Sequence, residues 1–134
     1  MKVWSLAIFG LVFIAQVNAL GSSCGVNTYF TNPGMTVNPT PAKGTTSTFT
    51  LTGTTPIALI LNEWDIYVNF NGAVTNQFDV PVTGNYTVNS PVSVSYKMVN
   101  SASAQSGYYT VRFMLQNSNG YYINCWTYSY YLVG

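Results

Sequence analysis

Few side chains in this 134-residue chain are suited to chemistry. The sequence contains no histidine, three acidic residues and two cysteines. Without histidine, the Ser–His and Cys–His pairs of nucleophilic enzymes are excluded, and so is a histidine-ligated zinc site. Gly-rich phosphate-binding loops are also absent from the sequence. These features indicate a binding or structural protein rather than an enzyme, and no metal ion or cofactor is expected.

Glu63 and Asp65 are two residues apart in a segment with strand-like alternation. Residues at this spacing on a strand point to the same face. Two carboxylates on one face could flank a glycosidic bond, which is the one catalytic hypothesis the acids allow. The simpler interpretation is favoured: both are charges on an exposed strand face.

Cys24 and Cys125 are the two cysteines of the chain. In an oxidising compartment two such thiols are expected to pair. The bridge would close a loop of about 100 residues and, in the chain-entropy treatment, would stabilise the fold by about 4–5 kcal/mol. Two free, buried thiols are the alternative.

Residues 1–19 have the pattern of a secretory signal peptide. Lys2 precedes the apolar run LAIFGLVFIA, and Val17-Asn18-Ala19 places small or compact residues before a cleavage point. A retained membrane anchor is the alternative, although a span needs about 20 apolar residues. We therefore expect a domain at residues 20–134 that is secreted (extracellular) or lies in the endolysosomal lumen.

The charges after residue 19 cancel. The basic and acidic side chains are Lys43, Lys97, Arg112, Glu63, Asp65 and Asp79. Nucleic-acid binding is not expected, because that affinity depends on clustered Lys and Arg that neutralise phosphates. Polybasic attraction to anionic membranes is equally unsupported. Asn85-Tyr86-Thr87 is an N-glycosylation sequon, and it falls in a predicted turn.

Alternating apolar and polar residues predict short strands and no helix. The strands are expected at residues 47–54, 62–72, 74–82, 91–98, 108–115 and in the aromatic C-terminal segment 120–134. Asn71-Gly72 and Asn119-Gly120 predict hairpin turns. Residues 83–85 and 101–107 are predicted as longer connections, and the proline-broken segment 32–44 as an edge strand. An all-β, two-sheet antiparallel sandwich satisfies this pattern, with a closed barrel as the alternative.

In the C-terminal segment the alternation separates two sets of aromatic residues. Trp126, Tyr128, Tyr130 and Leu132 are predicted to face inward, whereas Cys125 points to the opposite face. Val74, Phe78, Val80 and Val82 are predicted to face inward from their own strand. From the residues alone, inward side chains that fill a dry core are the simpler interpretation, and a ligand cavity is the alternative.

Four segments together resemble the ML (MD-2-related lipid-recognition) family, in its secreted lipid- and sterol-transfer branch. They are CGVNTYF from Cys24, residues 37–53, WDIYVNFNG from Trp64, and residues 106–132. The resemblance implies an immunoglobulin-like β-sandwich with a lipid between its sheets. It also implies that Cys24 and Cys125 correspond to the family's first and last cysteines, which pair. Two further bridges that are usual in the family are missing, and one of them would fall at residues 79–91, near the pocket entrance.

The resemblance implies a carrier that holds a sterol or phospholipid and exchanges it between membranes, as a monomer with transient membrane contact. The candidate lipid-binding residues are Trp64, Ile66, Val68, Phe70, Phe78, Val80, Val94, Tyr96, Val111, Phe113, Trp126, Tyr128 and Tyr130. The rival hypothesis is an extracellular carbohydrate-binding or adhesive module. Its stacking platform would be Tyr108, Tyr121, Tyr122 and Tyr131. A plain structural domain of a secreted coat or matrix is a third hypothesis.

Overall fold

Strands account for all the regular secondary structure of the described residues. The computed structural model describes residues 21–24 and 29–134, so the predicted signal peptide and part of CGVNTYF lie outside it. The elements are β1 (Ser22–Ser23), β2 (Thr31–Asn38), β3 (Thr46–Thr55), β4 (Leu59–Phe70), β5 (Ala73–Tyr86), β6 (Ser90–Val99), β7 (Gly107–Asn117) and β8 (Tyr122–Leu132). Across these ranges there is no candidate transmembrane helix.

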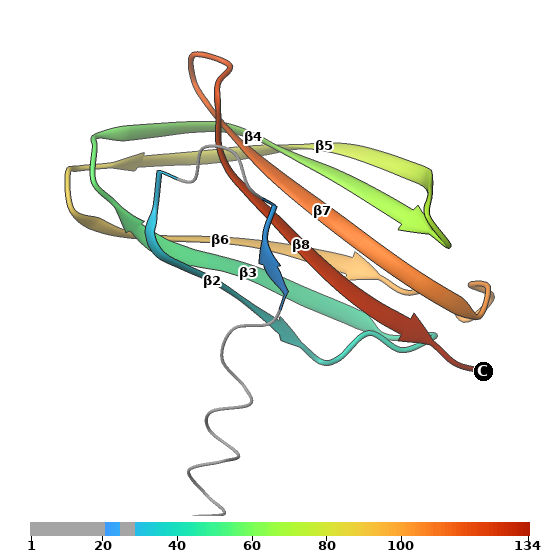
Figure 1. The fold of residues 1–134 in the computed structure, drawn as a ribbon. Coiled ribbons are helices and arrows are strands. Elements are labelled where there is room, and N and C mark those ends of the chain that lie inside the picture. Colours follow the sequence, from blue (N-terminus) through green and yellow to red (C-terminus); the bar gives the residue numbers. More distant parts are fainter. Residues whose placement is uncertain (1–20, 25–28) are drawn as a thin grey trace, which may run out of the picture.

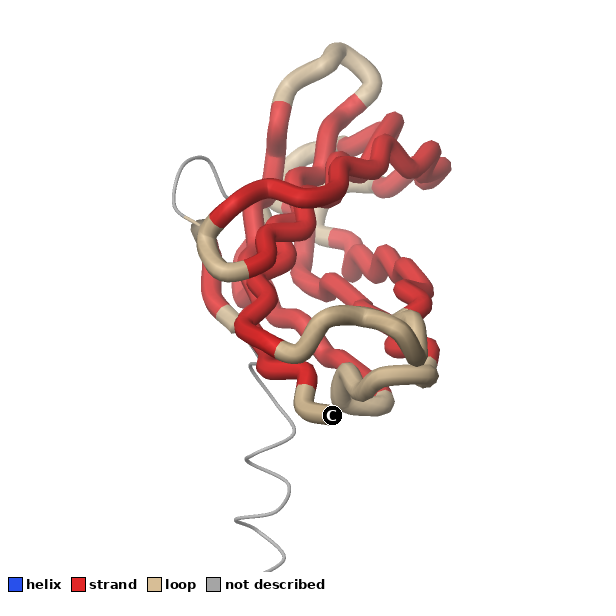
Figure 2. The backbone as a smooth tube through the Cα atoms, turned by 90° about the vertical axis from the view of Figure 1, so that its right-hand side faces the viewer, coloured by secondary structure: helices blue, strands red, loops and turns tan. Residues whose placement is uncertain are grey.

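The strands form two antiparallel sheets that face each other (Figure 1). One sheet has the order β1-β8-β7-β4-β5 and the other the order β2-β3-β6. Figure 2 shows the two layers, which lie apart at the side nearest β5 and β6. The predicted two-sheet sandwich is therefore confirmed over the barrel, and β2 is an edge strand as expected, paired with β3.

Both predicted hairpin turns are confirmed. Asn71 and Gly72 join β4 to β5 with φ angles of 49° and 90°, a backbone region that Asn and Gly tolerate best. Between β7 and β8, the side-chain oxygen of Asn117 accepts hydrogen bonds from the N–H groups of Asn119 and Tyr121, at 3.0 and 2.9 Å. These local bonds give the backbone N–H groups of the turn a partner, and the turn in turn sets which residues of β7 and β8 are opposite each other.

Two predictions about β5 are wrong. Residues 83–85 continue the strand rather than forming a connection, because Gly84 and Asn85 pair with Leu61 and Ile60. A bulge between Leu61 and Glu63 separates these pairs from the rest of the ladder. Val74 does not face inward. A second bulge places it opposite Asn69, on the outer face, where it is exposed. One extra residue reverses the face of every side chain before it relative to those after it.

The core lies between the sheets and follows the predicted alternation. Ile66 of β4 lies beside Phe113 of β7, and both are fully buried. In β8 the inward residues Trp126, Tyr128, Tyr130 and Leu132 are also buried, whereas Tyr121 and Tyr131 are exposed. The parity prediction for the C-terminal strand is thus confirmed.

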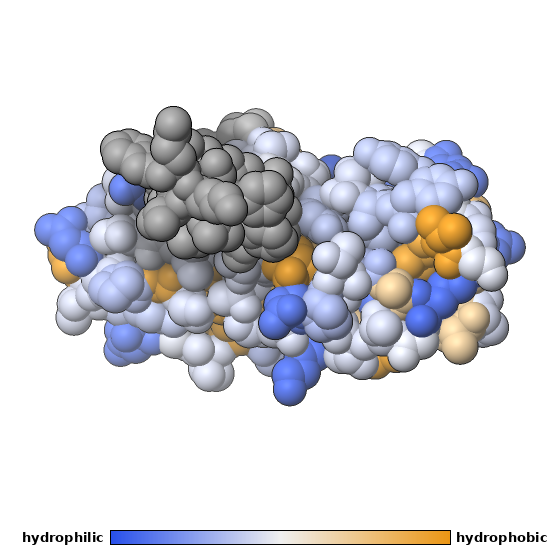
Figure 3. Space-filling model, turned by 90° about the horizontal axis from the view of Figure 1, so that it is seen from below, coloured by the Kyte–Doolittle hydropathy of each residue, from blue (hydrophilic) through white to orange (hydrophobic). Residues whose placement is uncertain are grey.

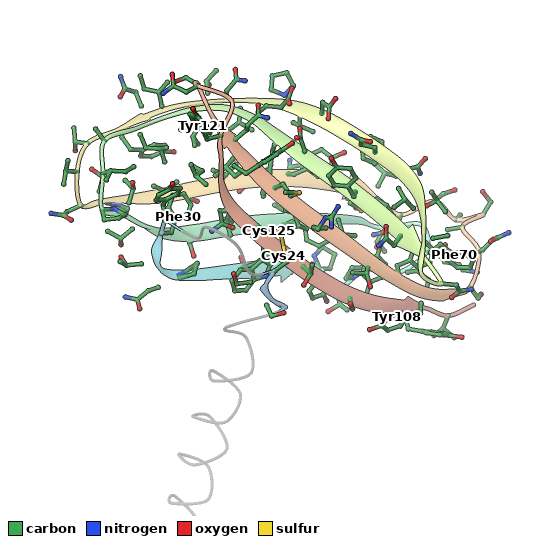
Figure 4. The ribbon with its side chains drawn as sticks, turned by 45° about the horizontal axis from the view of Figure 1, so that its top comes forward. Cys24, Phe30, Phe70, Tyr108, Tyr121 and Cys125 are labelled. Atoms are coloured by element: carbon green, nitrogen blue, oxygen red, sulfur yellow. A yellow bond between two sulfur atoms is a disulfide. The ribbon has the colours of Figure 1, made fainter. Side chains whose placement is uncertain are left out.

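The disulfide joins the start of the described chain to its last strand. Cys24 is bonded to Cys125 with a Cα–Cα distance of 5.2 Å (Figure 4), within the ordinary range for such bridges. The N–H of Cys24 also donates to the carbonyl of Cys125 at 3.0 Å. The predicted pairing is confirmed, and it fits a protein of the extracellular space or lysosomal lumen.

Candidate ligand pocket

A pocket of about 320 Å³ opens at one end of the sandwich. This is the end where β4 turns into β5, where β6 leads through residues 100–106 into β7, and where β8 finishes (Figure 1). Phe70 and Tyr108 lie at this end in Figure 4, and one of the apolar patches visible in Figure 3 is at the same end. The lining residues are Val68, Phe70, Thr75, Asn76, Phe78, Met98, Val99, Asn100, Ser101, Ala104, Gln105, Tyr109, Tyr130 and Leu132.

The pocket exists because the two sheets differ in width. The larger sheet ends at β5 and the smaller one at β6, and these two edge strands are not paired with each other. Adjacent strands are about 4.8 Å apart, so a three-stranded sheet cannot cover the whole inner face of a five-stranded one. Phe78 shows the result: it lies beside the buried Ile66 but remains 38% exposed. The inner face of β5 therefore forms one wall of the pocket.

Seven aromatic rings run from the buried Trp64 to this pocket. They are, in order, Trp64, Phe113, Phe49, Tyr128, Tyr130, Tyr109 and Phe70. Successive ring centroids are 4.8 to 5.8 Å apart, the range of favourable aromatic contact. We call this set the aromatic row. Most of the inward rings therefore contact one another, and three of them, Phe70, Tyr109 and Tyr130, also reach the pocket.

The polar groups of the pocket are uncharged, and half of the lining residues carry one. The Tyr109 hydroxyl donates to the carbonyl of Gln105 at 2.7 Å, and the Tyr130 hydroxyl lies 4.0 Å from the sulfur of Met98. Asn100 is buried and its side-chain amide donates to Ser47 at 3.1 Å. Since no lysine, arginine or acid is among the lining residues, the pocket suits a neutral, largely apolar ligand.

Gly107 allows the Phe70 ring to lie where it does. Its φ of 154° is in a region that favours glycine, and a Cβ placed there would lie 2.6 Å from the ring carbon Cε1 of Phe70. Any larger residue at the start of β7 would therefore have to displace the ring. The first residue of β7 thus helps to shape the pocket wall.

Four of the predicted lipid-binding residues line the pocket, namely Val68, Phe70, Phe78 and Tyr130. The other nine pack in or against the core behind it: Trp64, Ile66, Val80, Val94, Tyr96, Val111, Phe113, Trp126 and Tyr128. Sequence reasoning missed Met98 and Tyr109 as lining residues, although both follow the alternation of their strands. No local signal marks Thr75, Asn76 or the connection 100–106.

The predicted four-tyrosine platform is not a single surface. Tyr108 and Tyr131 are opposite each other where β7 begins and β8 ends, whereas Tyr122 pairs with Gln116 at the other end of the same strands. Eight residues of strand separate the two places, which is about 25 Å. Tyr121 and Tyr108 are accordingly far apart in Figure 4. Only the Tyr108–Tyr131 pair offers a shared outward face near the pocket.

Glu63 and Asp65 are joined on the outer face by Asp79, with carboxylate oxygens of all three within 4.8 Å of one another. The expectation of an exposed pair is wrong for Asp65, which is buried. Glycosidases hold their carboxyl groups about 5–5.5 Å or 6.5–9.5 Å apart, so this closer group does not match either geometry. The lack of histidine argues against zinc, but it says nothing about cations that prefer oxygen ligands.

The group is electrostatically unusual. A hydrogen bond with Asp65, desolvation and the negative charges of Asp65 and Asp79 raise the pKa of Glu63. The hydrogen bond that Tyr122 donates to Asp65 raises the pKa of Tyr122 to about 12. Carboxylates this close together repel each other when ionised, so the site favours a bound proton or a bound cation.

Tyr130 should titrate late. Burial and the neighbouring Tyr109 and Tyr128 raise the pKa of Tyr130 to about 12, against an ordinary value of about 10. Tyr130 ionises at a lower pH in the unfolded chain than in the folded one. Its contribution to the stability of the fold is therefore complete below about pH 10 and is lost as the pH rises from about 10 to 12.

The measurement is the alkaline rise of tyrosinate absorbance in the native chain minus that of the Tyr130→Phe variant. The difference should appear near pH 12, and the same subtraction for the exposed Tyr131→Phe serves as the control. A Tyr130 difference that rises near pH 10 would contradict the burial of this hydroxyl.

Comparison with solved structures supports the architecture. A Niemann-Pick type C2 protein from Japanese carpenter ant superimposes with a TM-score of 0.66 and 7% sequence identity, over 85% of this chain and 99% of that one. The chain has the fold of that protein. At this identity the likeness concerns the fold alone, and it confirms the two-sheet sandwich expected from the sequence.

A weaker likeness involves part of a larger protein. The alkylpurine DNA glycosylase AlkC from Pseudomonas fluorescens, bound to DNA containing an abasic site analog, matches with a TM-score of 0.50 and 15% identity. The match covers 73% of this chain but 28% of the glycosylase. No protein-family model and no curated protein matches the sequence. The fold is thus shared with proteins of different functions, and the function has to be argued from the pocket.

Proposed function

We propose that the chain is a secreted or endolysosomal lipid carrier of the ML family. In this proposal the pocket between the sheets takes a sterol, or one acyl chain of a phospholipid, and exchanges it with membranes. The likeness to a Niemann-Pick type C2 protein supports a β-sandwich of the lipid-binding kind. The confirmed disulfide supports the compartment.

The single observation that carries the proposal is the uncharged pocket at the end of the aromatic row. Its 320 Å³ is at the low end of the range for ligand pockets, about 300–1,000 Å³. A space of this size suits one acyl chain or one ring system better than a two-chain lipid inserted whole. Asn76, Gln105 and the hydroxyl of Tyr109 would contact a neutral head group at the mouth.

The energetics of such a carrier are those of exchange. Removing each CH₂ group from water gains about 0.8 kcal/mol, so a sixteen-carbon chain gains on the order of 12 kcal/mol. A bilayer offers nearly the same gain. Transfer between a bilayer and a pocket of similar apolarity is therefore close to thermoneutral, and a shuttle of this kind needs no energy source.

Three further elements belong to the proposal. Residues 1–19 would be removed as a signal peptide, the mature chain would act as a monomer, and Asn85 would carry a glycan. Asn85 is exposed near the end of β5, at the end of the molecule opposite the pocket. A glycan there would leave the pocket mouth free.

The test is lipid uptake by a variant that fills the pocket. Ala104 lines the pocket from the connection 100–106, and Ala104→Trp would place an indole ring in the space. Excluding only two CH₂ groups of the ligand costs about 1.6 kcal/mol, so uptake of a fluorescent sterol or fatty acid should weaken about tenfold or more. Organic extraction of the purified native chain, followed by mass spectrometry, should identify the lipid it carries.

Ala102→Trp is the matched control. Ala102 is in the same connection but is exposed and is not among the lining residues. It should leave uptake unchanged. Absence of any extracted lipid, together with no uptake by the native chain, would refute the carrier function. Equal uptake by both variants would place the ligand elsewhere.

Carbohydrate binding remains the second candidate because of one observation. Tyr108 and Tyr131 are directly opposite across β7 and β8, and both rings are exposed. Paired exposed rings can stack on the apolar face of a sugar. Retention on a polysaccharide resin that is lost in Tyr131→Ala, in a chain without extractable lipid, would favour this function.

A further inference from the structure

All the acidic residues of the sequence meet at one place. The chain has three in total, and they are Glu63 and Asp65 of β4 and Asp79 of β5. Asp65 and Asp79 are direct cross-strand partners, and Glu63 is two residues from Asp65 on the same face. Carboxylate oxygens of the three lie within 4.8 Å of one another. We call this group the acidic triad.

Among the described residues, the basic side chains contact other partners or lie on the other sheet. Like charges directly opposite on a sheet are destabilising. Of the basic side chains in the described residues, Lys43 donates to Ser106 near the pocket, and Lys97 is on β6 of the other sheet. Arg112 lies over the ring of Tyr67, 4.8 Å from its centroid. Three carboxylates therefore share one location without three cations to match them.

Asp65 supplies an independent indication of a ligand. Its side chain is only 4% exposed. The hydroxyl of Tyr122 donates to Oδ2 at 2.6 Å, but Oδ1 is buried and has no hydrogen-bond donor among the described residues. Buried carboxylate oxygens are normally paired, because leaving one without a partner is costly. This oxygen belongs to the carboxylate that lies beside Glu63 and Asp79. A cation held between the three carboxylates would give it a partner.

The donor atoms identify the class of cation. Carboxylate oxygens without nitrogen or sulfur suit hard cations such as Ca²⁺ and Mg²⁺. Ca²⁺ holds its oxygens at about 2.3–2.6 Å, so two of them are at most about 5.2 Å apart, whereas Mg²⁺ at about 2.1 Å allows only about 4.2 Å. Oxygens spread within 4.8 Å of one another are therefore better matched to the larger ion.

We propose that the acidic triad is a Ca²⁺ site, with Glu63, Asp65 and Asp79 as ligands and Tyr122 as a positioning residue that orients Asp65. Glu63 and Asp79 are more exposed than Asp65, so water completes the coordination. A cation held here ties β4 to β5 on the outer face. β5 is the edge strand whose inner face supplies Phe78 to the pocket.

The test is terbium luminescence, in which Tb³⁺ replaces Ca²⁺ and is excited through a nearby tyrosine. Tyr122 is in contact with Asp65, so the native chain should give saturable emission. Ca²⁺ should displace Tb³⁺ in the range of about 10⁻⁴–10⁻³ M that is typical of extracellular modules. Ca²⁺ should also raise the melting temperature, since it binds only the folded chain.

Variants of the more exposed ligands keep the test free of folding defects. Glu63→Gln and Asp79→Asn should each weaken Ca²⁺ competition about tenfold or more, because each removes one charged ligand. Gln77→Ala, on the same face of β5, is the control and should bind like the native chain. The proposal is overturned by absence of terbium emission, by Ca²⁺ that does not compete, or by Mg²⁺ that competes as well as Ca²⁺.

Discussion

Replacing Cys24 and Cys125 together by serine should lower the free energy of unfolding by about 4–5 kcal/mol. The bridge spans a sequence separation of 101 residues, and in the chain-entropy treatment a loop of about 100 residues corresponds to about 4.7 kcal/mol. Small domains have only about 5–15 kcal/mol in total, so the variant should be marginally stable. Urea unfolding of the native chain and the double variant measures the difference.

The native chain treated with a reductant is the control for the substitutions themselves. It should unfold at the same urea concentration as the double-serine variant, because both lack only the bridge. A midpoint that does not change on reduction would show that the pairing of β1 with β8 holds the start of the domain without help from the disulfide.

Phe113→Ala should destabilise the fold by about 3–5 kcal/mol, the usual cost of removing a large aromatic side chain from a closed core. Phe113 is fully buried, and its ring centroid lies 5.1 Å from those of both Phe49 and Trp64. Removing it would interrupt the aromatic row at its most enclosed point, where the neighbouring rings cannot close the gap. Chemical denaturation measures the loss.

Phe78→Ala is the matched control, because Phe78 and Phe113 lie on either side of the same residue, Ile66. Phe78 is 38% exposed and faces the pocket, so its removal should cost only about 1–2 kcal/mol. Equal losses in the two variants would show that the space under β5 is as tightly packed as the core. If lipid binds as proposed, Phe78→Ala should also weaken uptake.

Local patterns predicted most of the strands and turns. The alternation of β4, β6, β7 and β8 indicated their buried faces, and Asn71-Gly72 and Asn119-Gly120 indicated two hairpins. β5 was harder because its register contains bulges. The bulge between Val68 and Asn69 decides which residue of β5 lies opposite Asp65, and that residue is Asp79. The sequence has no local mark for this bulge, so the third member of the acidic triad could not be assigned.

The pocket was predictable only in part, for a different reason. Alternation tells which face of a strand is apolar, but not which sheet the strand joins. The space under β5 depends on five strands facing three, which is a property of the whole topology. Val68, Phe70, Phe78 and Tyr130 were therefore identified by their inward direction alone. Asn100 and Ala104 could not be, because the connection that carries them has no alternation.

The position of the aromatic row separates what keeps the domain folded from what a ligand would contact. Its enclosed rings, such as Phe113 and Phe49, are buried at strand centres, whereas the pocket is completed by strand ends and by residues 100–106. Substitutions at Thr75, Ala104 or Gln105 can therefore change the shape of the pocket at little cost in stability. A scaffold organised in this way can acquire new ligand preferences by single mutations, in evolution or by design, while the rest of its sequence stays the same.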